Sequence, residues 1–188
     1  MRRKGGKRLF QIRKGVFETN SSSTHSICIS RAEAKIPVGQ TVHFCMGEYG
    51  WENDTVFDTA SYLYTGIMEN DGAAENLEKL KEMLDEMGVK CDFHYLGKNR
   101  WGGDYGYVDH SYELIPFINA VLSSKDLLAR YLFGDSFINT GNDNQDCKPS
   151  GCNIGDDVIW EDDENGKYTK KPNPYHDPEN YEYFVKGN

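Results

Sequence analysis

The sequence predicts a loop-rich α+β domain, in which a mixed or antiparallel sheet of short strands is combined with about four helices. Apolar residues recur at intervals of three and four in the middle of the chain, which is the period of helices. Short apolar runs bounded by Gly, Asn and Asp elsewhere indicate strands. An aromatic share of 13% together with 19 glycines favours such a fold over a helical bundle.

Strands are predicted first, in the N-terminal quarter. Leu9, Phe10 and Ile12 suggest a strand that pairs with a second one starting at Thr24 and carrying Ile27 to Ile29. The chain is expected to turn at 37–39, where Pro and Gly occur. Alternation over 41–46 predicts another strand.

Two helices follow, over 55–69 and 73–87. Asp54 is a suitable N-cap for the first, and Asp71-Gly72 separates the two. The second has an apolar stripe with charges elsewhere, and Gly88 falls at its C′ position. The stripe consists of Leu77, Leu80, Leu84 and Met87.

The segment 89–96 is predicted as a strand with Cys91, Phe93 and Tyr95 on one face. Asp92 and His94 then share the other face, and His94 is expected to be exposed rather than catalytic.

The second half of the chain alternates short helices with short strands. Helices are expected over 112–122, where Asp109 or Ser111 would be the cap, and over 126–133, capped by Ser124. Pro116 falls early enough to be tolerated in a first helical turn. Strands are expected at 137–139, 158–160 and 181–185.

The domain organisation is predicted in three parts. Residues 1–14 form a basic arm or the first strand, 15–160 a single α+β domain, and 161–188 an acidic, Pro-containing tail that is free or packed on the domain. With no long apolar run, no membrane association is expected and a location in the cytoplasm of a host cell is favoured.

The first candidate site is the hydroxyl-rich segment 17–26. Asn and Ser in a turn leave backbone N–H groups that can bind an anion, so a phosphate-bearing ligand such as a nucleotide is expected there. His25 is the candidate catalytic residue because an imidazole transfers protons near neutral pH. The alternative is a Ser/Thr-rich hairpin turn that needs no ligand. The expected ligand-binding residues are Asn20, Ser21, Ser22, Ser23, Thr24 and Ser26.

Other candidates lie in later loops. Trp51 and Arg100 could stack on or clamp a ligand, or could only pack within their loops. His110, which follows an aspartate at a strand exit, is a second candidate catalytic residue; the alternative is helix capping by its neighbours.

Metal sites are suggested by two pairs of residues. Asp143 and Asp146 carry the oxygen ligands that Mg²⁺ or Ca²⁺ prefer, without EF-hand spacing, and turn chemistry explains them equally well. Cys147 and Cys152 could form half of a zinc site, although no second pair has matching spacing. No cofactor is identified by the sequence.

Charge is distributed unevenly around a net value of −9. Residues 1–14 contain seven basic side chains and no acidic one, whereas 156–164 contain six carboxylates. The net acidity argues against stable binding of double-stranded nucleic acid. An acidic surface that imitates nucleic acid and binds a basic protein fits the sign better.

Three stretches carry a resemblance: 18–26 (ETNSSSTHS), 47–51 (GEYGW) and 140–144 (TGNDN). They resemble a group of proteins of unassigned activity carried by bacteriophages and mobile elements of Gram-positive bacteria. The resemblance implies a phage or prophage setting and, with it, a factor that blunts a bacterial defence system. It implies no reaction type.

Three functions therefore stand side by side. The first is binding of a phosphate-bearing ligand by the 20–26 segment, with or without hydrolase or transferase activity. The second is an acidic inhibitor of a host defence or nucleic-acid enzyme, comparable to an anti-CRISPR protein. The third is a metal-dependent hydrolase. The sequence leaves open whether the protein is an enzyme.

Overall fold

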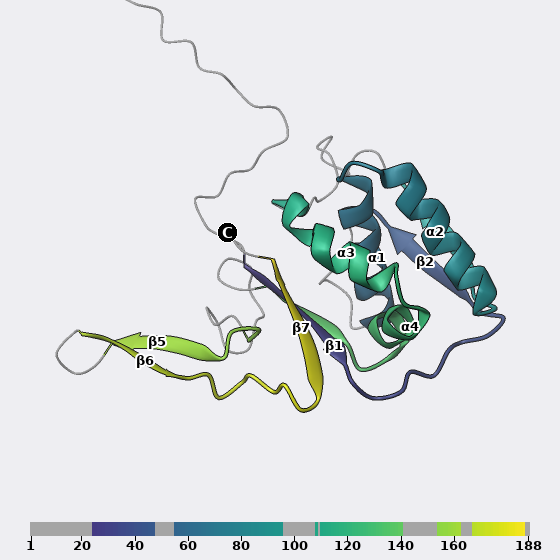
Figure 1. Ribbon diagram of the computed structural model, residues 1–188. Helices are drawn as coiled ribbons and strands as arrows, with labels where there is room; N and C mark the ends of the chain where they lie inside the picture. Colours follow the sequence, from purple (N-terminus) through teal and green to yellow (C-terminus); the bar gives the residue numbers. More distant parts are fainter. Residues whose placement is uncertain are drawn as a thin grey trace, which may run out of the picture.

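The computed structural model describes residues 24–47, 55–95, 108, 110–140, 154–162 and 167–186. Within these ranges the chain is an α+β fold with four α-helices, one 3-10 helix and short strands (Figure 1). The fold class predicted from the sequence is confirmed. In chain order the elements are β1 (His25–Ser30), β2 (Thr41–Cys45), α1 (Thr55–Met68), α2 (Ala73–Glu86), β3 (Lys90–His94), η1 (Ser111–Leu114), α3 (Ile115–Val121), α4 (Lys125–Phe133), β4 (Phe137–Thr140), β5 (Val158–Asp162), β6 (Tyr168–Pro172) and β7 (Tyr181–Lys186).

The strands of the described ranges form three separate sheets. The largest has the order β4-β1-β7, and both pairings are antiparallel. All six residues of β1 are buried, because a strand lies on each side of it and other elements cover its faces. The predicted closing strand at 181–185 is confirmed as β7, which joins the C-terminal part of the chain to the centre of the fold.

A second unit consists of β2, α1, α2 and β3. Its two strands are parallel, a geometry that requires a long crossover, and α1 and α2 supply it. The predicted turn at 37–39 is confirmed, as is the predicted position of Gly88 after α2. The residues Gly39 and Gly88 adopt φ values of 81° and 71°, a region that side chains disfavour.

Helix α1 is the centre of the hydrophobic core. It packs against β2, α2, α3, α4 and β4, and every residue from Thr59 to Ile67 is buried. A Cβ on Gly66 would come within 2.9 Å of Leu114 Cδ1, so glycine permits the close approach of η1.

Hydroxyl groups of α1 bind the free edge of β2. Ser61 Oγ accepts a hydrogen bond from the Cys45 backbone N–H at 3.1 Å, and Thr65 Oγ1 accepts one from the Gly47 N–H at 2.8 Å. Buried backbone donors need such partners. The helix therefore takes the place of a further strand on this side of β2.

The predicted helix over 112–122 begins differently from the expectation. The segment opens as the 3-10 helix η1, and α3 starts only at Ile115, with Pro116 in its first turn as predicted. Capping by Ser111 is wrong, because Ser111 is already inside η1 and the cap position is His110, in the left-handed region with φ 53°. Ser124 is confirmed as the cap of α4: its Oγ accepts from the Leu127 N–H at 3.2 Å.

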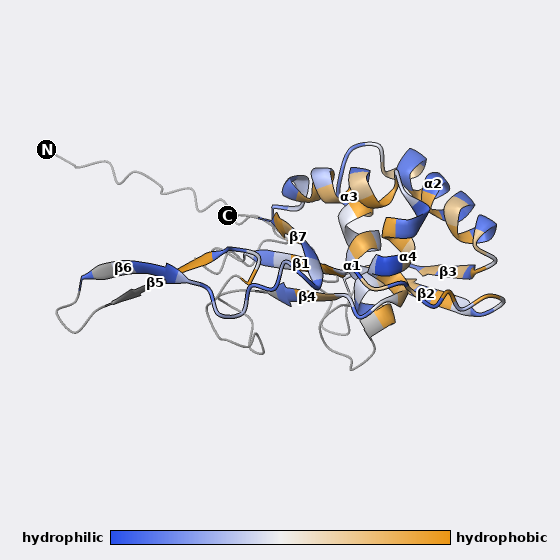
Figure 2. Cartoon of the chain, turned by 60° about the horizontal axis from the view of Figure 1, so that its bottom comes forward, coloured by the Kyte–Doolittle hydropathy of each residue, from blue (hydrophilic) through white to orange (hydrophobic). Residues whose placement is uncertain are grey.

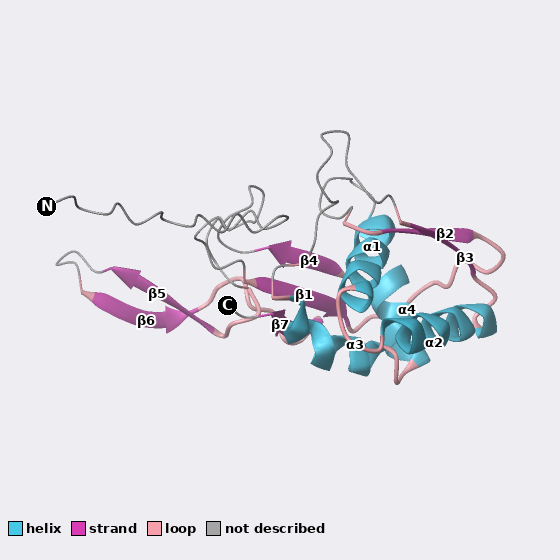
Figure 3. Ribbon diagram, turned by 90° about the horizontal axis from the view of Figure 1, so that it is seen from above, coloured by secondary structure: helices cyan, strands magenta, loops and turns pink. Residues whose placement is uncertain are grey.

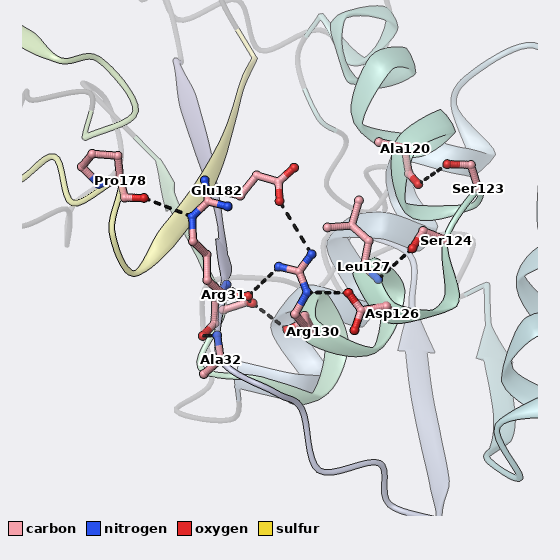
Figure 4. Close-up of polar contacts among 12 residues, drawn as sticks. Arg31, Ala32, Ala120, Ser123, Ser124, Asp126, Leu127, Arg130, Pro178 and Glu182 are labelled. Carbon is pink, nitrogen blue, oxygen red and sulfur yellow. Dashed lines mark hydrogen bonds and ion pairs between the residues drawn. The ribbon is translucent and has the colours of Figure 1, made fainter.

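A network around Arg130 connects α4 to β1 and β7 (Figure 4). Its guanidinium donates to the Ser30 carbonyl at 2.9 Å and to Asp126 at 2.9 Å, and it lies 3.7 Å from the Glu182 carboxylate. Nearby, Arg31 donates to the Pro178 carbonyl at 3.0 Å. The bond from Arg130 to Ser30 joins residues 100 positions apart in the sequence, and the bond from Arg31 to Pro178 joins residues 147 positions apart.

The strands β5 and β6 form a hairpin that extends away from the helices (Figures 1 and 3). Figure 2 shows that β6 is largely hydrophilic, whereas the orange, apolar faces of the helices point toward one another and toward the sheets. At the base of the hairpin, Asn173 donates to the Asp156 carbonyl at 2.8 Å and its N–H donates to Asp157 O at 2.9 Å. The predicted strand at 158–160 is confirmed as the start of β5.

Some predictions fall on residues that lie outside the described ranges, namely the strand at 9–12 and the caps Asp54 and Asp109. Among the helices that are described, none has the length and apolar character needed to span a bilayer.

Candidate functional site

Three side chains of types that can bind a metal ion meet on the exposed face of the β2-β3 pair. His43 stands at the middle of β2, and Asp92 and His94 are two residues apart on β3. The register places His43 directly opposite Asp92. Their ligand atoms all lie within 4.8 Å of one another, and no other such group of three or more His, Cys, Asp or Glu occurs among the described residues.

The Asp92 carboxylate connects the two imidazoles. Its Oδ2 lies 2.8 Å from His94 Nε2 and 3.2 Å from His43 Nδ1. The two imidazole rings are stacked, with centroids 5.8 Å apart. Ligands at about 2.1 Å from one ion are separated by about 3.0 to 3.4 Å at octahedral or tetrahedral angles. The two distances to Asp92 Oδ2 are near this range, and the contact with His94 Nε2 is also a hydrogen bond.

The three side chains remain open to solvent: His43 is 55% exposed, Asp92 47% and His94 42%. Below them, Phe44 and Phe93 stack in the core with centroids 4.6 Å apart, and Tyr64 packs on Phe93. The apolar inner face thus fixes the two strands, while the outer face presents the ligands. His94 is the last residue of β3, so the group is near the carboxyl ends of a parallel pair, where open α/β sheets bind ligands.

Sequence reasoning placed two of these three residues on one face but predicted no site there. The shared face of Asp92 and His94 was predicted and is confirmed, whereas His94, which was expected to be exposed, is half-buried with 42% of its side chain exposed. His43 was not singled out. The available signal was its position between Val42 and Phe44, both buried, which places His43 on the outer face of β2. That β2 would pair with β3 could not be read from alternation alone.

His25 lies at the start of β1 and is 3% exposed. Its Nδ1 is 2.9 Å from the Tyr62 hydroxyl. Burial, and secondarily the charge of Lys186, lowers the pKa of His25 to about 3, so the imidazole is neutral at physiological pH. A catalytic role of His25 stays a prediction. Such a role would have to be performed by an imidazole that is buried and neutral.

The neighbouring hydroxyl of Ser26 is also used within the fold. Ser26 is fully buried, and its Oγ accepts a hydrogen bond from the Gly155 N–H at 2.9 Å. Thr24 immediately precedes β1 and is half-buried. The described part of the predicted ligand loop therefore belongs to a strand and its approach. Asn20, Ser21, Ser22 and Ser23 lie outside the described residues.

His110 is exposed at the entrance of η1, and its Nδ1 lies 3.3 Å from the Tyr112 hydroxyl. A carboxylate that the sequence did not indicate, Glu69, holds the same turn: it accepts from the Val108 N–H at 3.0 Å. Burial raises the pKa of Glu69 to about 7, against the opposing effect of hydrogen bonds from Val108 and Ser111. Among the described residues, His110 is not a member of the group formed by His43, Asp92 and His94.

Several predicted site residues lie outside the described ranges, so their roles stay predictions. They are Trp51, Arg100, Asp143, Asp146, Cys147 and Cys152. In the sequence, Trp51 follows β2 and Arg100 follows β3, the two strands that carry the His43 group.

No protein-family model matches the chain, and comparison with curated proteins and with solved structures found no match.

Proposed function

We propose that the protein binds a divalent transition-metal ion through His43, Asp92 and His94 and acts as a metal-dependent hydrolase. The observation that supports this proposal is the convergence of the three ligand atoms within 4.8 Å on a solvent-exposed strand pair. Two imidazoles and one carboxylate suit zinc, iron and manganese better than calcium.

Three protein ligands leave room for water on the ion. A bound ion lowers the pKa of such a water and supplies a hydroxide nucleophile near neutral pH. Because each ligand side chain is between 42% and 55% exposed, a substrate can approach without rearrangement of the core. The hydroxyl-rich segment predicted to bind phosphate makes phosphate esters the first substrates to examine.

Metal binding is tested by calorimetric titration with Zn²⁺, Mn²⁺ and Mg²⁺. His43→Ala, Asp92→Asn and His94→Ala should each weaken binding by more than about 100-fold, because loss of a direct ligand exceeds the effect of losing an outer partner. Asp85→Asn removes an exposed carboxylate of α2 outside the group and should leave affinity unchanged. Equal affinity in all four variants would reject the site.

Hydrolysis is tested with bis(p-nitrophenyl) phosphate as the probe. We expect activity that EDTA removes, that the matching metal restores, and that is lost in the three ligand variants but retained in Asp85→Asn. Tight metal binding without hydrolysis of this or other ester probes would retain the metal site and reject the hydrolase.

Phosphate binding by the 20–26 segment is a separate proposal. Because Ser26 and His25 are engaged inside the fold, it now depends on Asn20, Ser21, Ser22 and Ser23. A nucleotide bound at this segment would raise the unfolding temperature of the wild-type chain, and would do so less in Asn20→Ala/Ser22→Ala. A phage setting and a cytoplasmic location are likewise proposals, supported by the sequence motifs alone.

The second candidate function is that of an acidic protein-binding inhibitor. It is favoured by the β5-β6 hairpin, which projects from the rest of the fold (Figure 1). Asp156 and Asp157, which directly precede β5, are exposed. An isolated two-stranded hairpin is of marginal stability in water, so a partner that covers it would stabilise it.

A further inference from the structure

The outer face of the β2-β3 pair has a fourth position beside the metal-ligating group. The register sets His43 opposite Asp92 and Cys45 opposite His94. Residues two apart on a strand share a face, and β2 follows this rule: Val42 and Phe44 are buried, whereas Thr41 and His43 are exposed and Cys45 is half-buried. The four side chains therefore occupy the corners of one patch.

The backbone at Cys45 is fixed on both sides. On one side, the ladder with β3 continues past it, because the Met46 N–H donates to the His94 carbonyl at 3.1 Å. On the other, the Cys45 N–H donates to Ser61 Oγ at 3.1 Å. Cys45 is thus held beside His94, across a strand spacing of about 4.8 Å.

The Cys45 thiol is reduced and stands outside the group of three whose atoms lie within 4.8 Å. Rotation about χ1 is the smallest movement that would turn it toward an ion bound beside His94. With a Zn–S bond of about 2.3 Å, such an ion can be shared by the side chains on both strands.

We propose that Cys45 is the fourth protein ligand of the ion held by His43, Asp92 and His94, and that the site selects a borderline-soft ion of the Zn²⁺ type over Mg²⁺ or Ca²⁺. The inference rests on the proposed metal site. On ligation the sulfur–metal bond forms and the thiol proton passes to solvent. With Cys45 bound, the water of the proposed hydrolase no longer takes the fourth position and binds only when zinc expands to five-coordination.

The other two described cysteines provide the matched controls. Cys28 is buried in β1, where burial raises the pKa of its thiol to about 12. Cys91 stands opposite Val42, on the inner face of the same strand pair, and burial raises the pKa of its thiol as well. Neither shares the face that carries His43.

The test is titration with Co²⁺, whose visible d–d bands report binding and whose near-ultraviolet charge-transfer band reports a thiolate ligand. It is run in a Cys147→Ser/Cys152→Ser background, because that predicted cysteine pair would give the same band. The background protein should show both signals. Adding Cys45→Ser should remove the charge-transfer band and weaken binding by about 10-fold or more, with the d–d bands retained. Adding Cys91→Ser should change neither.

Visible bands without charge transfer in the background protein, or a charge-transfer band that survives Cys45→Ser, would overturn the role of Cys45 while leaving the three-ligand site intact. Absence of both signals would overturn the site itself. A readout that needs no variant at Cys45 is alkylation by iodoacetamide, followed by peptide mass spectrometry. Zn²⁺ should protect Cys45 in the folded protein, and this protection should be lost in His94→Ala; equal alkylation with and without Zn²⁺ would also overturn the inference.

Discussion

At the scale of single residues, His25 couples the acidity of the solution to the stability of the fold. Its imidazole is buried beside Tyr62, and its pKa is lowered from 6.5 to about 3. The unfolded chain therefore takes up a proton at a higher pH than the folded chain. The free energy of unfolding contributed by His25 is complete above pH 6.5 and falls as the pH decreases toward 3.

We expect this loss to reach on the order of 3 kcal/mol between about pH 7 and about pH 4, measured by urea unfolding. His25→Gln should reduce the loss, because the amide can bond to Tyr62 without titrating. The control is His176→Gln, which replaces a less buried histidine whose Nδ1 lies 3.0 Å from the Ile154 carbonyl. This variant should show the same loss of unfolding free energy as the wild-type chain. A pH profile unchanged by His25→Gln would contradict this account.

Glu69 changes the free energy of unfolding with pH in the direction opposite to His25. Its contribution must therefore be removed before the His25 variants are compared. The pKa of this carboxyl group is raised from 4.5 to about 7, so the folded chain holds the proton more tightly. Its stabilising contribution is complete below pH 4.5 and is lost as the pH rises through 7. The His25 variants are therefore compared in a Glu69→Gln background.

At the scale of elements, Arg130 is the side chain on which the junction of α4, β1 and β7 depends. Its planar guanidinium bonds the Ser30 carbonyl and Asp126 at once and approaches Glu182, and its side chain is only 16% exposed (Figure 4). We expect Arg130→Lys to lower the free energy of unfolding by about 2 kcal/mol, because the lysine ammonium lacks the planar set of donors that bonds these partners simultaneously.

The matched control is Arg31→Lys. Arg31 also donates to a backbone carbonyl, that of Pro178, but through an exposed bond at the surface. Its replacement should change the free energy of unfolding by less than about 0.5 kcal/mol. Urea unfolding of both variants at one pH provides the measurement, and equal losses would refute the importance of the Arg130 junction.

The helices could be predicted from the sequence because their signals are local. The predicted ranges 55–69 and 73–87 agree closely with Thr55–Met68 and Ala73–Glu86, since the apolar period lies within each segment and Gly88 follows the second helix directly. The 3-10 start of the 112–122 segment was missed. Its cap is a histidine in the left-handed region, which no pattern of capping residues indicates.

Strand pairing could not be predicted in the same way. The His43 group exists because β2 pairs in parallel with β3 across two helices, and alternation in either strand does not identify its partner. In a similar way, Ser26 was assigned to a ligand loop because its neighbours are hydroxyls. Ser26 bonds instead to Gly155, which is 129 residues away in the sequence, so this contact depends on the final fold.

At the scale of the whole molecule, the candidate metal site and the acidic hairpin are carried by different units of the fold. The former lies on the β2-β3 pair, and the latter belongs to the separate β5-β6 sheet (Figure 3). Loss of one surface should therefore leave the other intact, which allows metal binding and partner binding to be tested independently.

For partner binding, the expected signature is dependence on salt. Charges on an exposed hairpin attract a basic protein through solvent, and this attraction is screened within about 8 Å at physiological ionic strength and about 3 Å at 1 M salt. Pull-down from a host lysate should recover a basic partner at about 50 mM NaCl and lose it at about 500 mM. The same loss should follow when Asp156, Asp157, Glu161, Asp162, Asp163 and Glu164 are replaced by their amides.

The control neutralises six carboxylates that are exposed on or next to α2: Asp71, Glu75, Glu78, Glu82, Asp85 and Glu86. Both variants move the net charge from −9 to −3, because six negative charges are removed from each. If the hairpin is the docking surface, only the first variant loses the partner, and its affinity for Zn²⁺ is unchanged. If both variants lose the partner equally, net charge alone drives capture and the inhibitor proposal fails, since nonspecific attraction depends on total charge rather than on one surface.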